Sequence, residues 1–290
     1  MGATQTTTGH GPTLRRGAAI LVRDEHQLQI GCDPEHSVLV DLPATASAHD
    51  VAVLLRSLGE PGRTSGLRGR LRRLGLSRTD FDDIVAPLRA MGAITTGARP
   101  TLRVCLHGRG PLRDGLGAAL SDAGYPLTRS SARLARPWRG GPPRPTLVVL
   151  TDFAHHDPLL VADLMQHRIP HLPVMLRDGV GVVGPLVLPG RSSCLHCADH
   201  HRATLDPQWP IVCAQLVDRI GFASDAITRL AVGAALEQID QIAAGLTERG
   251  ARRPDLVDTT LEIHPRPVRL RHKEWPAHPN CSCGASRRDS

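Results

Sequence analysis

The segment 101-TLRVCLHGRGPLRDGLGAAL-120 decides the fold of the larger part of this chain. Apolar residues alternate from Leu102 to Leu106, which predicts a buried strand, and leucines four residues apart after position 110 predict a helix. Gly108 and Gly110 lie in the turn between them. A strand, a glycine turn and a helix in this order open a nucleotide-binding α/β fold.

The nucleotide signature of this segment is incomplete. Arg113 stands in place of the third glycine of the G-x-G-x-x-G pattern, and residues 125–143, where an acid would hold a ribose, contain no Asp or Glu. Asp152 ends the next buried strand, in 145-PTLVVLTDF-153. We therefore expect a fold that keeps its shape and has lost its nucleotide, with Gly108, Gly110 and Asp152 as a degenerate nucleotide site.

The remaining pattern continues this alternation of strands and helices. A helix is expected within 157–170, two strands within 171–190, helices over 209–221 and 224–246, and late strands over 259–272. The sequence predicts an α/β fold, with a Rossmann-like domain over residues 97–290.

Residues 15–96 have a different pattern. A hairpin breaks at Asp24-Glu25-His26, a third short strand follows in 37-SVLVDLP-43, and three helical stretches come after it. Ser77 and Asp80 form a capping-box pattern at the start of the last helix, and Pro87 should kink or shorten that helix. This is the outline of a small α+β winged-helix domain, preceded by a flexible tail over 1–14.

The composition limits the possible functions. The formal net charge is +7, and the cations are almost all arginines, because Lys273 is the only lysine. Such a surface suits acidic peptides or nucleic acid. No apolar run is long enough to cross a membrane and the N-terminus has no secretion signal, so we expect a cytoplasmic protein without a membrane partner.

The seven cysteines include two close pairs, Cys194/Cys197 and Cys281/Cys283. Pairs separated by one to four residues supply two metal ligands from one turn, and four thiolates leave no open position, so we expect a structural Zn²⁺ site. A redox Cys-x-x-Cys pair and a Cys/His nucleophile are the alternatives. The isolated Cys32, Cys105 and Cys213 are expected to be buried small hydrophobes.

The glycine turn, the strand ending in TDF, the segment 184-GPLVLPGRSSCLHCADHHRATLDPQWP-210 and the terminal 275-WPAHPNCSCG-284 together resemble the ThiF-type adenylating family. The similarity is greatest to the "C protein" branch, the leader-binding partner of YcaO-type cyclodehydratases in the biosynthesis of azoline-containing ribosomal peptides (TOMMs), including bacteriocins. The N-terminal region resembles the PqqD-like recognition element that this branch carries in front.

The resemblance implies a function in peptide modification. The chain would bind the leader of a precursor peptide and present it to the cyclodehydratase for thiazoline or oxazoline formation, as a non-catalytic subunit. The resemblance also implies a homodimer. Active family members use a Lys for the phosphates, but Lys273 lies in the zinc tail and the ribose acid is absent. ATP is therefore not expected as a cofactor.

In the family's recognition element the leader adds a strand beside the third strand, against the last helix. Mapped here, the peptide-binding residues are Val38, Val40 and Leu42 on the strand and Phe81, Ile84, Val85 and Leu88 on the helix, with Arg68, Arg72 and Arg73 attracting acidic leader residues. The four helix residues fit a core equally well. An active ATP-dependent adenylating enzyme and a winged-helix DNA-binding protein remain the competing interpretations.

Overall fold

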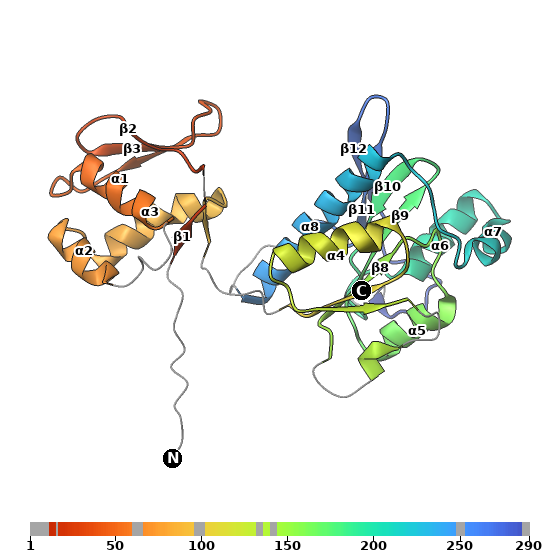
Figure 1. Cartoon of the computed structure of the whole chain (residues 1–290). Helices are drawn as coiled ribbons and strands as arrows, with labels where there is room; N and C mark the ends of the chain where they lie inside the picture. Colours follow the sequence, from red (N-terminus) through yellow and green to blue (C-terminus); the bar gives the residue numbers. More distant parts are fainter. Residues whose placement is uncertain are drawn as a thin grey trace, which may run out of the picture. The chain divides into compact units, whose positions relative to one another are not determined.

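The computed structural model describes residues 12–15, 17–59, 66–95, 102–131, 136–139, 144–247 and 253–285. It divides into two compact units, Met1–Ala98 and Arg99–Ser290 (Figure 1). Most of the predicted tail lies outside the described residues, but Thr13–Leu14 form strand β1, which pairs antiparallel with β5, Ile94–Thr95. The tail was therefore predicted two residues too long.

The N-terminal unit holds a three-stranded antiparallel sheet in the order β2-β3-β4. Its strands are β2 (Ile20–Val22), β3 (Gln27–Ile30) and β4 (Val38–Asp41), and the expected hairpin turn lies between β2 and β3. Helices α1 (Ala48–Ser57), α2 (Leu67–Arg73) and α3 (Arg78–Ala90) follow. The Ser77–Asp80 capping box is present, and α3 continues through Pro87 to Ala90.

The C-terminal unit is built on a seven-stranded mixed sheet in the order β12-β11-β10-β9-β8-β6-β7. Strands β6 (Val104–His107), β7 (Leu127–Ser130), β8 (Leu147–Thr151) and β9 (His171–Arg177) are parallel. Strands β10 (Val180–Val183), β11 (Thr259–His264) and β12 (Arg269–Glu274) extend the sheet antiparallel. The predicted α/β class is confirmed.

Helices cover both faces of this sheet, because neighbouring strand residues point to opposite sides. Val104 and Val149 pack with α4 (Pro111–Asp122) and α8 (Asp225–Thr247) in one core. Cys105 and Val148 pack on the other face with α5 (Pro158–Gln166) and the 3-10 turn η1 (Pro137–Arg139). Helices α6 (Leu195–Leu205) and α7 (Trp209–Leu216) lie to one side (Figure 1).

Two details differ from the sequence prediction. Helix α6 was not predicted, and it contains Cys197 and all three histidines of the Cys-x-x-Cys segment. Cys32 is exposed rather than buried, and Cys213 is only partly buried, whereas Cys105 is fully buried as expected. None of the helices in the described ranges combines the length and the apolar character that a membrane crossing needs.

Candidate functional site

The glycine turn lies between β6 and α4, where the sequence placed a degenerate nucleotide site. The structure brings Gly108, Gly110 and Asp152 together at the carboxyl ends of β6 and β8. Asp152 accepts hydrogen bonds from the backbone N–H of Leu112 at 2.9 Å and of Arg113 at 3.1 Å. A helix N-terminus with free N–H groups would bind a phosphate, but here a carboxylate of the protein already takes that place.

The first residue of α4 strengthens this conclusion. Pro111 has no N–H, so the first three helical residues leave no free donor toward a ligand. Asp152 is 1% exposed, and this burial raises the pKa of its carboxyl, opposed by the two backbone hydrogen bonds. Asp152 therefore takes the two N–H donors that a phosphate would use at this turn.

Both glycines are explained by contacts within the protein. A Cβ on Gly110 would lie 2.6 Å from Asp152 Oδ1, and one on Gly108 would lie 2.3 Å from the carbonyl oxygen of Thr151. Their φ angles, +141° and +149°, also disfavour any residue with a side chain. The glycines permit a close approach of the β8 end to the turn, rather than the approach of a nucleotide.

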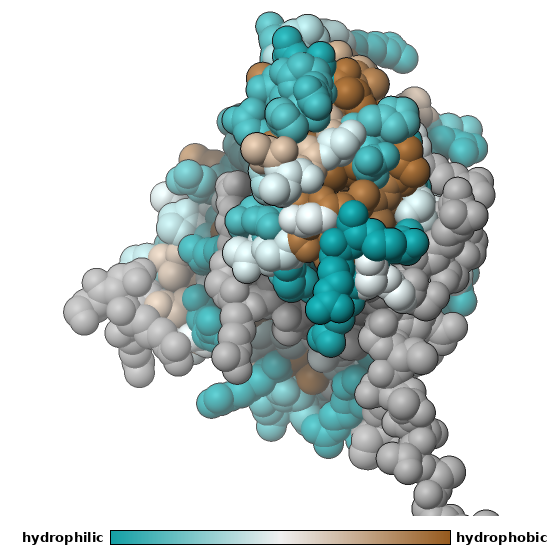
Figure 2. Space-filling model, turned by 90° about the vertical axis from the view of Figure 1, so that its left-hand side faces the viewer, coloured by the Kyte–Doolittle hydropathy of each residue, from teal (hydrophilic) through white to brown (hydrophobic). Residues whose placement is uncertain are grey.

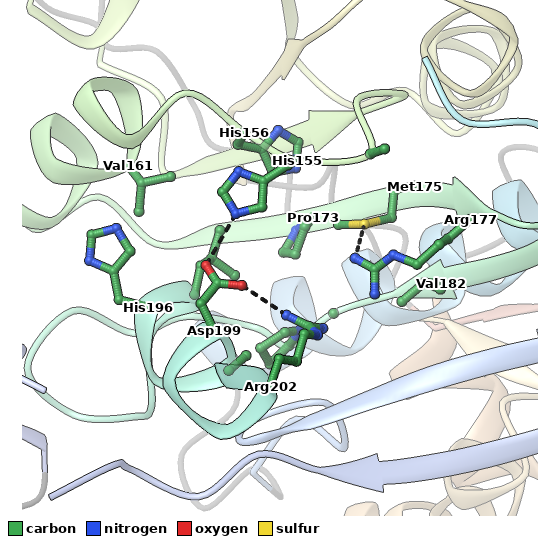
Figure 3. Close-up of a pocket in the computed structure, with 15 residues that line it drawn as sticks. His155, His156, Val161, Pro173, Met175, Arg177, Val182, His196, Asp199 and Arg202 are labelled. Carbon is green, nitrogen blue, oxygen red and sulfur yellow. Dashed lines mark hydrogen bonds and ion pairs between the residues drawn. The ribbon is translucent and has the colours of Figure 1, made fainter. Parts of the chain in front are cut away.

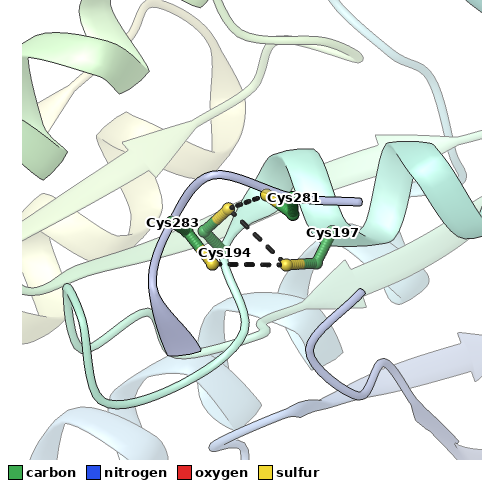
Figure 4. Close-up of side chains that lie close together, drawn as sticks. All are labelled: Cys194, Cys197, Cys281 and Cys283. Atoms are coloured by element: carbon green, nitrogen blue, oxygen red, sulfur yellow. Dashed lines mark hydrogen bonds between the residues drawn. The ribbon is translucent and has the colours of Figure 1, made fainter. Parts of the chain in front are cut away.

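The second site is a cluster of the four paired cysteines (Figure 4). The Sγ atoms of Cys194 and Cys197 are 3.8 Å apart, those of Cys194 and Cys281 are 3.6 Å apart, and those of Cys197 and Cys283 are 3.6 Å apart. These separations are far too long for a disulfide. Four sulfurs bound tetrahedrally at about 2.3 Å from zinc are about 3.8 Å from one another, so the cluster has the dimensions of a Zn²⁺ site.

Two distant segments form the cysteine cluster. Cys194 is the N-cap of α6, and the preceding Ser193 N–H donates to Asp258 at 2.6 Å. The C-terminal segment is held by the indole N–H of Trp275, which donates to Thr260 on β11 at 3.1 Å. The sulfurs are therefore brought together by the fold rather than by local sequence.

The thiols of this cluster perturb one another. The Cys194 thiol donates to Cys197, which lowers the pKa of Cys197 to about 4 and raises the pKa of Cys194. Burial raises the pKa of Cys281 to about 11. A divalent cation would stabilise all four groups as thiolates, since only the thiolate is a metal ligand.

The histidines of α6 lie around this cluster. The rings of His200 and His278 stack at 4.8 Å, and His201 meets the His278 ring edge-on at 4.9 Å. The sequence analysis did not single out His278, which is brought here by the C-terminal segment. These rings pack against one another and are not members of the metal-binding cluster of the described residues.

The predicted peptide-binding strand is at a sheet edge in the N-terminal unit. In the described part of the chain β4 pairs with β3 alone, so its other edge has no strand partner. Val38 is partly buried, whereas Val40 and Leu42 are buried. Leu39 and Met91 are 48% and 41% exposed, and Met91 adjoins Gly31 beside the start of β4.

The predicted helix face is inside the core. Phe81, Ile84, Val85 and Leu88 are all 3% exposed or less and pack with the sheet and α1. The structure therefore agrees with the core interpretation of these four residues. Arg68, Arg72 and Arg73 are exposed on α2. Figure 2 shows an apolar area on one face of the N-terminal unit.

Several solved structures of other proteins have a similar fold. A heterocyclase in complex with substrate and cofactor is similar over 96% of this chain and 40% of its own, with 15% identity and a TM-score of 0.63. The heterocyclase TruD is similar over 95% of this chain and 43% of its own, with 16% identity and a TM-score of 0.57. E. coli MccB bound to ATP is similar over 94% of this chain and 99% of its own, with 11% identity and a TM-score of 0.57.

At these identities the likeness establishes the fold. The similarity extends over both units, and the chain spans about two fifths of the length of each heterocyclase. No family model matches the sequence, and no curated protein matches it.

Proposed function

We propose that this protein binds the leader of a ribosomal precursor peptide and presents it to a YcaO-type cyclodehydratase for azoline formation. In this proposal the N-terminal unit, a PqqD-like winged helix, recognises the leader. The C-terminal unit, a ThiF-like domain with a structural Zn²⁺, serves as a scaffold. The proposal draws on the fold shared with heterocyclases and with MccB, one of whose structures contains the peptide MccA.

The observation that carries the proposal is the free edge of β4. An extended peptide can add as a fourth strand there, because backbone N–H and C=O groups at an unpaired edge accept a new strand. Leu39 on β4 and Met91 at the C-cap of α3 offer exposed apolar surface near this edge. The buried residues of α3 would support the sheet from the core side without touching the peptide.

Charge supports an acidic leader. Arg68, Arg72 and Arg73 are exposed on α2 within the same unit, and α2 has no acidic residue. Exposed charges of one sign raise the association rate of an oppositely charged partner more than they raise its affinity. A leader with Asp and Glu beside its apolar residues therefore suits this unit.

The scaffold assignment follows from the glycine turn. Adenylation needs a bound nucleotide and cations at its phosphates. Asp152 occupies the N-terminus of α4, and Lys273, the only lysine, lies on β12. The proposed zinc at Cys194, Cys197, Cys281 and Cys283 would fasten the C-terminal segment to α6.

Peptide binding is tested with a fluorescein-labelled leader from a short open reading frame beside a YcaO-type gene, by fluorescence polarisation on the full chain. Leu39→Pro and Val38→Pro are compared, since neighbouring N–H groups of a strand point to opposite edges. One of these two substitutions removes an N–H donor that points away from β3. That variant should lose peptide binding while the N-terminal unit stays folded. Equal binding by both folded variants would refute strand addition.

The alternative is an active adenylating enzyme. ATP–pyrophosphate exchange with the full chain and the precursor peptide separates the two functions. The proposal predicts no exchange above buffer, and exchange by this chain alone would establish the enzyme. A winged-helix DNA-binding protein would instead bind duplex DNA with a steep salt dependence.

A further inference from the structure

A small cavity in the C-terminal unit lies between β9, β10 and α6, and its wall includes Leu195 and Ala198, the neighbours of Cys194 and Cys197 in the chain (Figure 3). Its volume is about 40 Å³, which is room for a carboxyl-sized group and not for a nucleotide. Figure 3 shows Arg177 on one side of this cavity and Asp199, Arg202 and His155 on the other. We call it the Arg177 pocket.

The one carboxylate in the wall of this pocket already has three polar contacts. Asp199 accepts hydrogen bonds from Arg202 at 3.1 Å and from the indole N–H of Trp209 at 3.0 Å, and His155 Nε2 lies 3.2 Å from its other oxygen. Arg202 is also held between two aromatic rings, 5.3 Å from Trp209 and 4.3 Å from Trp275. Asp199 therefore pairs with Arg202, and it makes no hydrogen bond to Arg177.

Arg177 has no such partner. Its Nη2 contacts only the thioether sulfur of Met175, at 3.3 Å, and its Nε is buried without a hydrogen bond. Within the described residues no carboxylate lies within 4.0 Å of this guanidinium, and Glu262 on β11, two strands away from β9, is paired with His264. Burial and Arg202 lower the pKa of Arg177, whereas the more distant carboxylates of Asp199, Asp178 and Glu262 raise it. A partly buried guanidinium without an anion is costly to the folded protein.

A second polar atom in the wall is also unsatisfied. His156 is 5% exposed, and its Nε2 has no hydrogen-bond partner. Burial lowers the pKa of His156 to about 3, so the ring is neutral and can donate one N–H. The wall of the pocket therefore holds two arginines against one carboxylate, together with donors that make no hydrogen bond.

A metal ion is the other ligand that this region suggests. One ligand atom each from His155, Asp199 and Cys213 lie within 4.8 Å of one another. Arg202 bonds the same carboxylate, however, and Arg177 stands beside it, so the local charge opposes a divalent cation. The charges favour an anion.

An apolar groove adjoins the Arg177 pocket. The two share His155, His196 and Asp199 in their walls, and the groove continues along α7 past Trp209, Pro210 and Val217. Its volume is about 340 Å³, and nearly all its lining surface is apolar. The groove thus lies beside the Arg177 pocket, on the other side of the His155–Asp199 pair, and a charged pocket next to an apolar groove suits an amphipathic ligand.

We infer that the C-terminal unit binds a carboxylate that carries an apolar chain, with the carboxylate on Arg177 and the chain in the groove along α7. The site is separate from β4 and does not depend on the proposed leader binding. The carboxylate can belong to a free acid or to the end of a peptide, and both sources share this chemistry.

The test measures binding of acetate, hexanoate and N-acetyl-leucine to the full chain by isothermal titration calorimetry and thermal unfolding. Hexanoate should bind more tightly than acetate by roughly three- to fourfold for each methylene that enters the groove. N-acetyl-leucine represents a peptide end, and its affinity relative to hexanoate decides between the two sources. Hexanol, which lacks the charge, should bind at least tenfold more weakly than hexanoate.

Two pairs of variants assign the site. Arg177→Met should abolish the stabilisation by hexanoate and leave the unliganded melting temperature equal or higher, whereas Arg229→Met, at an exposed arginine of α8, should behave as wild type. Met175→Glu places a carboxylate beside Arg177. It should raise the melting temperature above that of Met175→Gln and prevent hexanoate binding.

Three results would overturn the inference. These are hexanoate binding that survives Arg177→Met, no response to any carboxylate in the wild type, or a second metal ion per chain that Cys213→Ala removes. The last result would assign the cluster to a metal instead. None of these measurements depends on the leader peptide, so they can fail or succeed independently of the proposed function.

Discussion

The C-terminal unit has two sites at helix N-termini, the glycine turn before α4 and the cysteine cluster at α6. These two sites satisfy their polar groups in opposite ways. At α4 the carboxylate of Asp152 takes the two backbone donors, and the site is complete within the protein. At α6 four sulfurs lie 3.6–3.8 Å from their neighbours, and without a cation the pKa values of Cys194 and Cys281 are raised. The first site is satisfied within the protein, whereas the second has the dimensions of a metal site.

The largest expected effect is at the cysteine cluster. Cys194→Ser should reduce bound zinc from one per chain to none and lower the melting temperature by about 10 °C or more, because structural zinc contributes directly to folding. Metal content is measured by plasma mass spectrometry. Cys32→Ser, at an exposed cysteine of the N-terminal unit, is the control and should keep both values. A metal-free but fully stable Cys194→Ser protein would contradict a structural role of the zinc.

The next effect is a loss of stability in acid near the glycine turn. Burial lowers the pKa of His107, the last residue of β6, from 6.5 to about 4. The folded state disfavours protonation of His107, so its contribution to stability is fully present above pH 6.5. As the pH falls from 6.5 to 4, the unfolding free energy should decrease by about 3 kcal/mol.

The measurement uses denaturant unfolding followed by tryptophan fluorescence. All three tryptophans, Trp138, Trp209 and Trp275, lie in the C-terminal unit, so the signal reports this unit alone. His107→Asn should flatten the decline between pH 6.5 and 4 relative to wild type, and His49→Asn, in the other unit, should not. Identical pH profiles for wild type and His107→Asn would exclude a buried neutral ring.

Removal of the internal carboxylate should come next. Asp152→Ala leaves the N–H groups of Leu112 and Arg113 without acceptors, which should cost about 2 kcal/mol of unfolding free energy in the same assay. Asp152→Asn keeps one acceptor oxygen and should lose less. An unchanged stability in Asp152→Ala would mean that this carboxylate does not fill the turn.

A smaller effect tests why the glycine is there. Gly110→Ala places a methyl group against Asp152. The unfolding free energy lost on this substitution should therefore be about 1 kcal/mol smaller in the Asp152→Ala background, where only the backbone strain at φ +141° persists. A double-mutant cycle on unfolding free energy measures this coupling. Strict additivity would remove the argument that the glycine serves an internal contact.

The smallest effect concerns the N-terminal unit. Reversal of Arg68, Arg72 or Arg73 to Glu should weaken an acidic leader by about threefold to fivefold for each residue, mainly through a slower association rate that converges with wild type at high salt. Stopped-flow polarisation separates the two rates. Arg229→Glu in the other unit should match wild type, and a loss of the same size there would indicate a nonspecific charge effect.

Local patterns were sufficient for much of this structure. The spacing of Cys194, Cys197, Cys281 and Cys283 predicted one cluster, and the glycine segment predicted the strand, turn and helix that open the sheet. Helix α6 was missed because its polar residues, His196, Asp199, His200 and His201, leave no continuous apolar stripe. The sequence also could not show which face of α3 becomes the core.

The Arg177 pocket lay beyond sequence reasoning for a different reason. Its charged residues come from β9 and α6, and the groove beside it is lined by α7. No short motif joins them, and each residue alone has an ordinary surface interpretation. Only the tertiary structure shows that Asp199 is occupied and that Arg177 has no carboxylate partner among the described residues.

The contrast between the two helix N-termini is tested most directly by native mass spectrometry of the full chain in the presence of Mg²⁺ and ATP. The filled glycine turn and the four-sulfur cluster predict a single species, the chain plus one zinc and no nucleotide. A chain without metal, or one that carries a stoichiometric ATP lost on Gly110→Ala substitution, would contradict this account.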